Sequence, residues 1–138
     1  MKKLMIIATG MALSFSTAGF AEGDIANGEK AFKKCKACHV IADGDEVHFK
    51  GGKTGPNLFG VLGRAVGGTD FKYGGAMASL GETGMIWTEE LLAEYVADPK
   101  AFLQTKLDDS AAKSKMTFKL KKGGEDVAAF LATFTPAE

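Results

Sequence analysis

Two cysteines three residues apart, with a histidine directly after the second, constrain this chain more than any other feature. They form the segment Cys35-Lys36-Ala37-Cys38-His39. On a helical turn, residues i and i+3 lie on one face, so both sulfurs can form thioethers with the two vinyl groups of one porphyrin. The neighbouring imidazole can then reach the iron, so the segment predicts covalent attachment of haem.

Two other interpretations of the cysteine pair remain open. A redox pair of the thioredoxin type is typical of a strand-helix-strand unit, and residues 24–60 show no such pattern. A structural disulfide or a zinc site is the second. Zinc needs four soft or nitrogen ligands, and the chain adds only His39 and His48 to the pair. The histidine directly after the second thiol favours haem over both.

The first 21 residues have the composition of a secretory signal peptide. Two lysines precede an apolar run over residues 4–15, and the segment ends in the small-residue pattern Gly19-Phe20-Ala21. Thr9, Gly10 and Ser14 interrupt the run, which is short for a bilayer span of about 20 residues. We therefore expect cleavage after Ala21 and export to the periplasm, rather than an uncleaved membrane anchor.

Residues 22–138 are long enough for one core and too short for two, so we expect a single domain. The whole chain has 17 basic and 17 acidic residues. The signal segment holds two of the lysines and no acid, so the mature chain has a formal charge of −2, from 15 basic and 17 acidic residues. This balance gives no indication of a nucleic-acid or membrane partner.

Apolar periodicity predicts a helix at each end of this domain. The first has an apolar or small face that leads into the cysteine motif, at Ile25, Gly28, Phe32 and Cys35. The last follows the i, i+3, i+4, i+7 pattern, at Val127, Phe130, Leu131 and Phe134. Glycine allows close approach, so we expect the two helices to cross at Gly28. The prediction is an all-α fold.

A third helix and several loops are predicted between the terminal helices. Thr88 is expected to be its N-cap, and its apolar face ends before Asp98-Pro99. Glycine pairs mark loops, at Gly51-Gly52, Gly67-Gly68 and Gly74-Gly75. No segment is predicted to be a strand. A chain this rich in loops needs a large group to pack around, so we expect the apoprotein to be largely unfolded.

A second ligand for the iron must come from far along the chain, because the segment around His39 covers one face of the ring. The candidates after the signal segment are Met77, Met85, Met116 and His48. Met116 lies in a polar segment just before the last helix, where a core methionine is not expected, and this favours it as the ligand. We interpret Met77 and Met85 as packing residues and His48 as solvated.

Further motifs accompany the cysteine pair. They are Lys53-Thr54-Gly55-Pro56-Asn57-Leu58-Phe59-Gly60, Gly63-Arg64, Trp87, Tyr95, Pro99 and Lys115-Met116-Thr117-Phe118. With these motifs, residues 23–134 resemble the class I c-type cytochromes, and among them the larger bacterial cytochromes c2. The stretch over residues 104–112 is longer than in mitochondrial cytochrome c, so the resemblance does not define the backbone route to Met116.

The resemblance implies the class I cytochrome c fold, with the terminal helices crossing and loops wrapped around one haem c. Cys35 and Cys38 would hold the haem, and His39 and Met116 would be the axial ligands. The Pro56 carbonyl would accept a hydrogen bond from the His39 ring. A buried propionate would accept hydrogen bonds from Arg64, Tyr73 and Trp87. The remaining implied neighbours are Tyr95, beside the Met116 sulfur, and Leu58, Phe118, Val127 and Leu131 along the ring, with Phe118 near its exposed edge.

Such a pocket favours reduced iron, because thioether sulfur and burial both penalise the extra charge of the ferric form. With both axial positions filled, the remaining chemistry is one-electron transfer, so we expect no enzyme activity. The resemblance implies a soluble periplasmic carrier between a cytochrome bc complex and a photosynthetic reaction centre or terminal oxidase. The alternatives are a cytochrome subunit of a larger oxidoreductase and a haem enzyme or gas-binding protein with an open iron site.

Lysines are expected on both sides of the haem opening: Lys33, Lys34, Lys36 and Lys53 near the first ligand, and Lys113, Lys115, Lys119, Lys121 and Lys122 near the second. Acidic residues gather elsewhere: Asp43, Asp45, Glu46, Glu89, Glu90, Glu94, Glu125 and Asp126. The resulting dipole would steer a monomeric carrier toward an acidic partner surface, and association would slow with salt. We expect charge reversal at Lys33, Lys115 or Lys119 to lower the bimolecular rate and to leave the reduction potential nearly unchanged.

Overall fold

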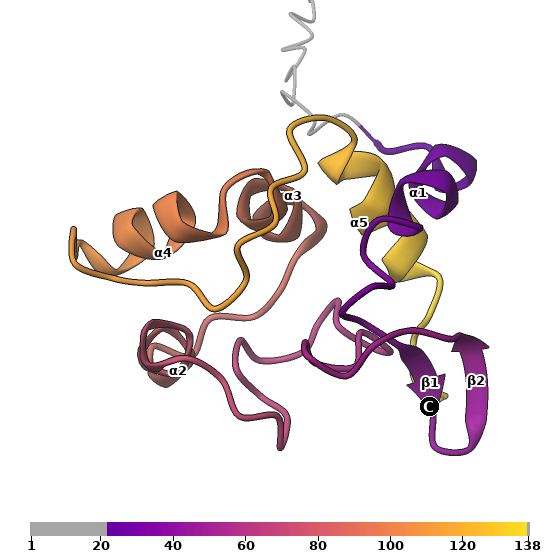
Figure 1. The fold of residues 1–138 in the computed structure, drawn as a ribbon, viewed down its shortest axis with the longest axis horizontal. Helices are drawn as coiled ribbons and strands as arrows, with labels where there is room; N and C mark the ends of the chain where they lie inside the picture. Colours follow the sequence, from indigo (N-terminus) through magenta and orange to yellow (C-terminus); the bar gives the residue numbers. More distant parts are fainter. Residues whose placement is uncertain (1–21, 138) are drawn as a thin grey trace, which may run out of the picture.

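The first and last helices of the described chain pack against each other (Figure 1). The computed structural model describes residues 22–137, so the predicted signal peptide lies outside the described residues. Helix α1 (Ile25–Phe32) meets α5 (Gly124–Ala132) at Gly28, where a Cβ would clash with the Asp126 carbonyl and lie 2.7 Å from the Cβ of Phe130. The predicted crossing at Gly28 is confirmed.

The N-terminus of α1 is fixed by two aspartates. Asp24 is its N-cap, since its carboxylate accepts a hydrogen bond from the Asn27 N–H at 2.8 Å. The Asp24 N–H in turn donates to Oδ1 of Asp126 at 2.7 Å, which ties the start of α1 to the first turn of α5. Below this contact, Phe32 is fully buried and its ring lies against that of Phe130.

Helix α3 (Glu89–Ala97) begins as predicted, with the Thr88 hydroxyl accepting from the Leu91 N–H at 3.2 Å. The helix ends before Asp98-Pro99, as predicted, but a further helix that the sequence analysis did not predict follows directly. Asp98 ends α3 and also caps α4 (Pro99–Leu107), accepting from the Ala101 N–H at 3.1 Å. Proline suits the first position of a helix, because no intrahelical partner exists there for a backbone N–H.

The prediction that Gly74-Gly75 lies in a loop is wrong at its second residue. Gly75 is the first residue of α2 (Gly75–Glu82), and Gly74 caps this helix without any side-chain hydrogen bond. Helix α2 packs against α4, and its one fully buried side chain is Leu80. Gly51-Gly52 and Gly67-Gly68 lie outside helices and strands, as predicted.

The expectation that no strand would form is also wrong. Strands β1 (Ile41–Asp43) and β2 (Glu46–Phe49) form an antiparallel hairpin, in which Asp43 pairs with Glu46 around a turn with Gly44 at φ 56°. The Phe49 ring packs edge-on against Phe32 and Phe130, which holds the hairpin on the terminal helices.

His48, on β2, is an exposed residue, as predicted. Its side chain keeps 28% of its surface exposed, and the ring stacks on Phe59 with the centroids 5.6 Å apart and the planes 8° from parallel. The Phe134 ring lies 5.4 Å away on the C-terminal segment. His48 is therefore solvated on one side and contacts the chain end on the other.

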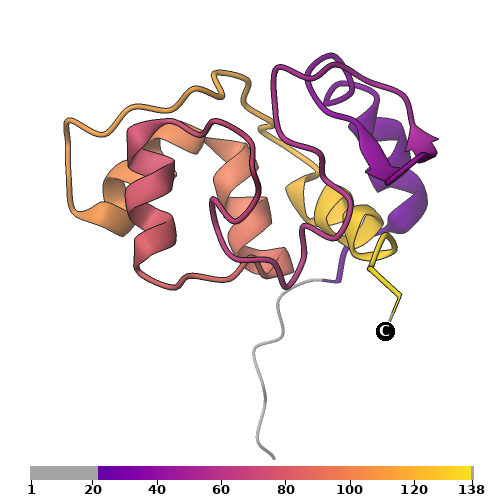
Figure 2. The same cartoon turned by 90° about the horizontal axis from the view of Figure 1, so that it is seen from below.

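The helices are arranged in two groups on either side of α5 (Figure 2). Helices α2, α3 and α4 lie on one side, where α4 contacts both α2 and α3, and α1 and the hairpin lie on the other. The all-α prediction is confirmed apart from the small hairpin. Within residues 22–137, no helix is both long and apolar enough to span a bilayer.

Candidate functional site

A mainly apolar cavity of about 400 Å³ opens among α1, α3, α5 and the loops that carry Pro56, Tyr73 and Met116. Every residue to which the sequence analysis gave a haem contact lies on its wall. These residues are Cys35, Cys38, His39, Pro56, Leu58, Arg64, Tyr73, Trp87, Tyr95, Met116, Phe118, Val127 and Leu131. Segments from both ends of the chain therefore converge on one site.

The cysteine motif forms a helical turn that continues α1 toward the cavity. The Cys38 N–H donates to the Cys35 carbonyl at 3.1 Å, and the His39 N–H donates to the same carbonyl at 3.0 Å. This turn places both thiols on the cavity wall. Burial, reinforced by the neighbouring Cys38, raises the pKa of Cys35 to about 11. The thiol is thus protonated at neutral pH, unlike the low-pKa thiolate of a redox-active pair.

His39 is 9% exposed, and one of its ring nitrogens is already engaged. Its Nδ1 lies 2.7 Å from the Pro56 carbonyl oxygen. A carbonyl accepts only, so Nδ1 carries the proton and Nε2 is left with a free lone pair. Burial lowers the pKa of His39, against an opposing effect of the Pro56 hydrogen bond, so the imidazole is neutral at pH 7. A neutral ring with a free Nε2 is the form that binds metal.

Gly55 is a site residue to which the sequence analysis gave no role. A Cβ at this position would clash with the His39 ring, lying 2.7 Å from Nδ1. The backbone of Gly55 therefore covers the imidazole closely and limits its rotation. Its place directly before Pro56 in the sequence is the one feature that points to this contact.

Arg64 carries a buried donor that has no partner among the described residues. Its Nη1 donates to the carbonyls of Asn57 at 3.0 Å and Phe59 at 3.4 Å, whereas the buried Nε makes no hydrogen bond. Burial lowers the pKa of Arg64, and the neighbouring Tyr73 opposes that shift. An unsatisfied buried donor on a cationic group is unfavourable unless an anionic acceptor approaches it.

Tyr73 and Trp87 share the cavity wall with Arg64. The Tyr73 hydroxyl is 2.7 Å from Oγ1 of Thr69, and Trp87 is 6% exposed. The Trp87 ring also packs against Tyr95 and lies nearly parallel to Phe102. The three residues expected to hold a propionate therefore line one cavity, although they come from different loops.

Hydroxyl groups organise the segment that carries Met116. Ser114 Oγ donates to the Met116 carbonyl at 2.8 Å. Tyr95 is buried, which raises its pKa, while a hydrogen bond with Ser114 acts in the opposite direction. Met116 lines the cavity, and so does Met77 from α2, which the sequence analysis assigned to packing alone. Met85 packs on the core away from the cavity wall.

These features fit the predicted haem. The cavity wall is mainly apolar, and it includes both cysteines, His39 and Met116. The unpartnered Arg64 Nε supplies the donor that a buried carboxylate requires. Phe118 is 42% exposed and also lines the cavity, which places it at the mouth beside Lys34, Lys113 and Lys115.

Comparisons with known proteins agree with this site. The chain is 55% identical over 136 residues to the cytochrome c2 of Rhodobacter capsulatus, covering 96% of this chain and 98% of that protein. It is 56% identical over 129 residues to the cytochrome c-551 of Roseobacter denitrificans, covering 92% and 93%. The solved structure of Rhodobacter capsulatus cytochrome c2 superposes with a TM-score of 0.78 at 57% identity, over 80% of this chain and 97% of the other. No protein-family model matches the chain.

Terminal helices that cross beside a Cys-x-x-Cys-His turn, with an apolar cavity lined by the histidine and a distant methionine, define a c-type cytochrome of class I. At more than half identity over nearly the full length of its relatives, the chain belongs to the cytochrome c2 subfamily of this class. The predicted fold class and the predicted cofactor, one covalently bound haem c, are confirmed with the family. The general prediction of an electron-carrying cytochrome is also confirmed. It replaces the interpretations of the cysteine pair as a thioredoxin-type redox pair, a structural disulfide or a zinc site.

Proposed function

We propose that this protein is a soluble periplasmic carrier that moves one electron from a cytochrome bc complex to a photosynthetic reaction centre, a terminal oxidase, or both. The observation that carries the proposal is that one mainly apolar cavity is lined by the Cys35-Cys38-His39 motif and by the distant Met116. The signal-peptide pattern of residues 1–21 supports the periplasmic location.

We assign the haem contacts to particular residues. Cys35 and Cys38 would form the thioethers, and Nε2 of His39 and the sulfur of Met116 would hold the iron. The Pro56 carbonyl fixes the His39 tautomer, and such a hydrogen bond also raises the basicity of the ligating nitrogen. Arg64, with Tyr73 and Trp87, would neutralise and hydrogen-bond a propionate.

Bound haem c supplies a ferric/ferrous couple, and the chain determines which state is favoured. Leu58, Val127 and Leu131 exclude water from the cavity wall, and a low-dielectric surrounding disfavours the state with more charge. The reduced state is therefore favoured. Two protein ligands would leave no coordination position for oxygen or peroxide, which supports a carrier rather than an enzyme or gas-binding protein.

The ligand assignment is tested by comparing two methionines of the same cavity. In Met116→Ala, we expect loss of the methionine-sulfur charge-transfer band of the oxidised protein and carbon monoxide binding to the reduced protein. Met77→Leu, the matched control, should keep the band and exclude carbon monoxide. An unchanged spectrum in Met116→Ala, or ready uptake of carbon monoxide by the wild-type protein, would refute the assignment and favour an open iron site.

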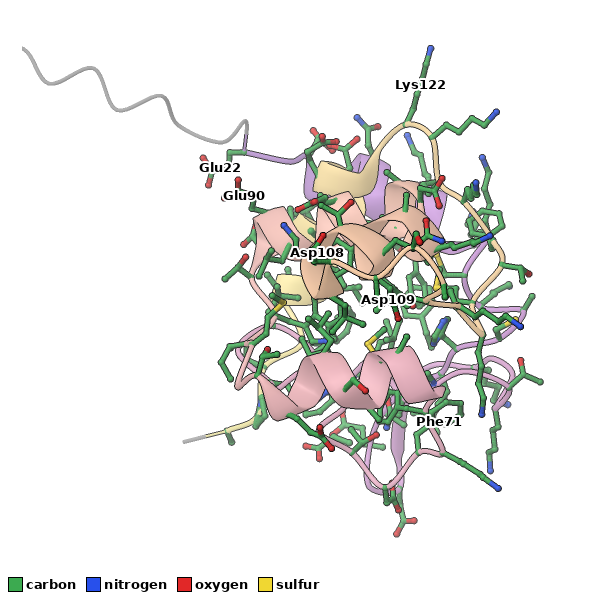
Figure 3. All side chains as sticks on the ribbon, turned by 90° about the vertical axis from the view of Figure 1, so that its left-hand side faces the viewer. Glu22, Phe71, Glu90, Asp108, Asp109 and Lys122 are labelled. Carbon is green, nitrogen blue, oxygen red and sulfur yellow. The ribbon has the colours of Figure 1, made fainter. Side chains whose placement is uncertain are left out.

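The charge distribution supports docking to an acidic partner through the haem opening. All nine lysines expected around the opening are exposed: Lys33, Lys34, Lys36, Lys53, Lys113, Lys115, Lys119, Lys121 and Lys122. Side chains tipped with nitrogen gather along the right edge of Figure 3, whereas Glu22 and Glu90 lie at its left. A separation of this kind orients the protein during encounter, and its effect declines with ionic strength.

The choice of acceptor is tested with the purified holoprotein. We would measure its reoxidation by isolated reaction centres and by oxidase-containing membranes, each across a range of salt concentrations. Fast reoxidation that slows with salt supports a diffusing carrier for that acceptor. Failure to react with either one, or purification only as part of a larger complex, would favour a fixed oxidoreductase subunit.

A further inference from the structure

The side chain of Asn57 bridges two separate parts of the chain. Its Oδ1 accepts from the N–H of Ala42 at 3.1 Å and from the N–H of Phe59 at 3.0 Å, and its Nδ2 donates to the Ala42 carbonyl at 2.8 Å. These partners define the orientation of the amide, because a flipped group would turn its NH₂ toward two donors. Asn57 thus joins strand β1 to the turn that contains it.

The backbone next to the Asn57 side chain contacts two residues of the site. On one side, the Pro56 carbonyl accepts the 2.7 Å hydrogen bond from the His39 ring. On the other, the carbonyls of Asn57 and Phe59 hold Nη1 of Arg64. Strand β1 itself begins two residues after His39, so the bonds to Ala42 also link the turn to the segment that carries the imidazole.

We propose that Asn57 is a positioning residue that keeps the side chains of His39 and Arg64 in place on the cavity wall. The Asn57 side chain fixes the conformation of the backbone at residues 56–59. In that conformation, one carbonyl accepts from the His39 imidazole and two accept from the Arg64 guanidinium. Loosening the turn would therefore release both side chains together. The inference rests on the proposed function, in which His39 binds iron and Arg64 binds a propionate.

The test uses hydrogen exchange in the reduced holoprotein, followed by NMR at the His39 Nδ1–H and the Arg64 Nη1–H, the two groups that donate to this backbone. In Asn57→Ala, we expect exchange at both positions to accelerate by about tenfold, since three hydrogen bonds are lost. The matched control is Asp24→Ala, which removes the cap of α1 outside the cavity wall and lowers global stability. It should leave both exchange rates near wild type under native conditions.

A second variant covers the case in which Asn57→Ala does not fold. Asn57→Ser retains a hydroxyl that can accept from the Phe59 N–H but cannot reach across to Ala42, and it should accelerate both exchange rates by a smaller factor. It decides the matter if Asn57→Ala yields no holoprotein. Unchanged rates, acceleration at one position only, or equal acceleration in Asp24→Ala would each overturn the inference. Failure of the proposed function would instead appear in the wild type, as a His39 ring without the resonance shifts of a haem ligand.

Discussion

The ammonium group of Lys119 lies 2.7 Å from Oδ2 of Asp98. The same carboxylate caps α4 through its other oxygen, so one acid ties the segment after Met116 to the junction of α3 and α4. Lys115 is engaged as well, because its Nζ donates to the Lys72 carbonyl at 2.8 Å. Two of the lysines expected to face a partner therefore also hold the chain around the cavity mouth.

A paired lysine and its acid contribute little together to steering at long range, because their fields cancel. We expect Asp98→Asn combined with Lys119→Gln to leave the rate of reoxidation by isolated reaction centres nearly unchanged at low ionic strength. Asparagine keeps the helix cap. Lys33→Gln removes a charge beside the cysteine motif that makes no ion pair within the described part of the chain, and it should lower that rate severalfold. Equal losses in both variants would contradict the cancellation, and the reduction potential should stay constant throughout.

The same ion pair predicts a dependence of stability on pH. The hydrogen bond from Lys119, with a second from the Ala101 N–H, holds the pKa of Asp98 below its ordinary value of 3.8. A depressed pKa in the folded state stabilises above the unfolded-state pKa, and this contribution is lost as the pH falls through the folded-state value. The unfolding free energies of the wild type and Lys119→Met should therefore differ above about pH 5 and converge below pH 3.8.

Urea unfolding between pH 3 and 6 measures this difference. Lys121→Met is the matched control, since Lys121 is exposed and makes no ion pair within residues 22–137. The difference in unfolding free energy between Lys121→Met and the wild type should vary less with pH. A gap for Lys119→Met that persists undiminished at pH 3 would show that the pair does not determine the Asp98 titration.

Two glycine substitutions should have opposite effects on stability, because only one of the two glycines lies at the crossing of α1 and α5. Gly28→Ala places a methyl group against the Asp126 carbonyl, and we expect it to lower the free energy of unfolding by about 2–4 kcal/mol. Gly75→Ala, at the first residue of α2 with nothing within 4 Å of the added Cβ, should raise it by about 0.5–1 kcal/mol. Denaturant unfolding of the two holoproteins checks both signs, and a neutral Gly28→Ala would argue against close helix contact.

The cap of α3 gives a smaller prediction. Thr88→Ala removes the hydroxyl that accepts from the Leu91 N–H, and we expect a loss of about 1 kcal/mol in unfolding free energy. Thr88→Ser keeps an acceptor and should recover most of it. The same denaturation measurement distinguishes the two, and equal losses in both would assign the effect to the threonine methyl group instead of the cap.

Periodicity and capping are sufficient to predict α1, α3 and α5, because each helix presents one apolar stripe to the core. They miss α4, since a proline after Asp98 ends one helix and begins the next, and a single aspartate serves both ends. They miss α2 because its start has no side-chain cap and its buried stripe is a single leucine. The hairpin has a local signal in the Gly44-Asp45 turn, but its strands span only three and four residues.

The sequence likewise predicts only some of the site residues. Spacing alone predicts Cys35, Cys38 and His39 as a unit, and the family resemblance adds the partners that the structure places on the same wall. The contact of Gly55 with the imidazole and the bridge made by Asn57 depend on loops far apart in sequence. Apart from the place of Gly55 directly before Pro56, no local pattern indicates which backbone atoms those loops bring together.

The packing of α1 on α5 encloses the two thiols with residues from the opposite end of the chain. Cys35 and Cys38 directly follow the first helix, whereas Val127 and Leu131, on the wall of the same cavity, belong to the last. In a largely unfolded apoprotein the two helices are apart, and both sulfurs are open to a bulky planar group. Docking of the last helix then encloses that group, so attachment is expected to precede the final packing step.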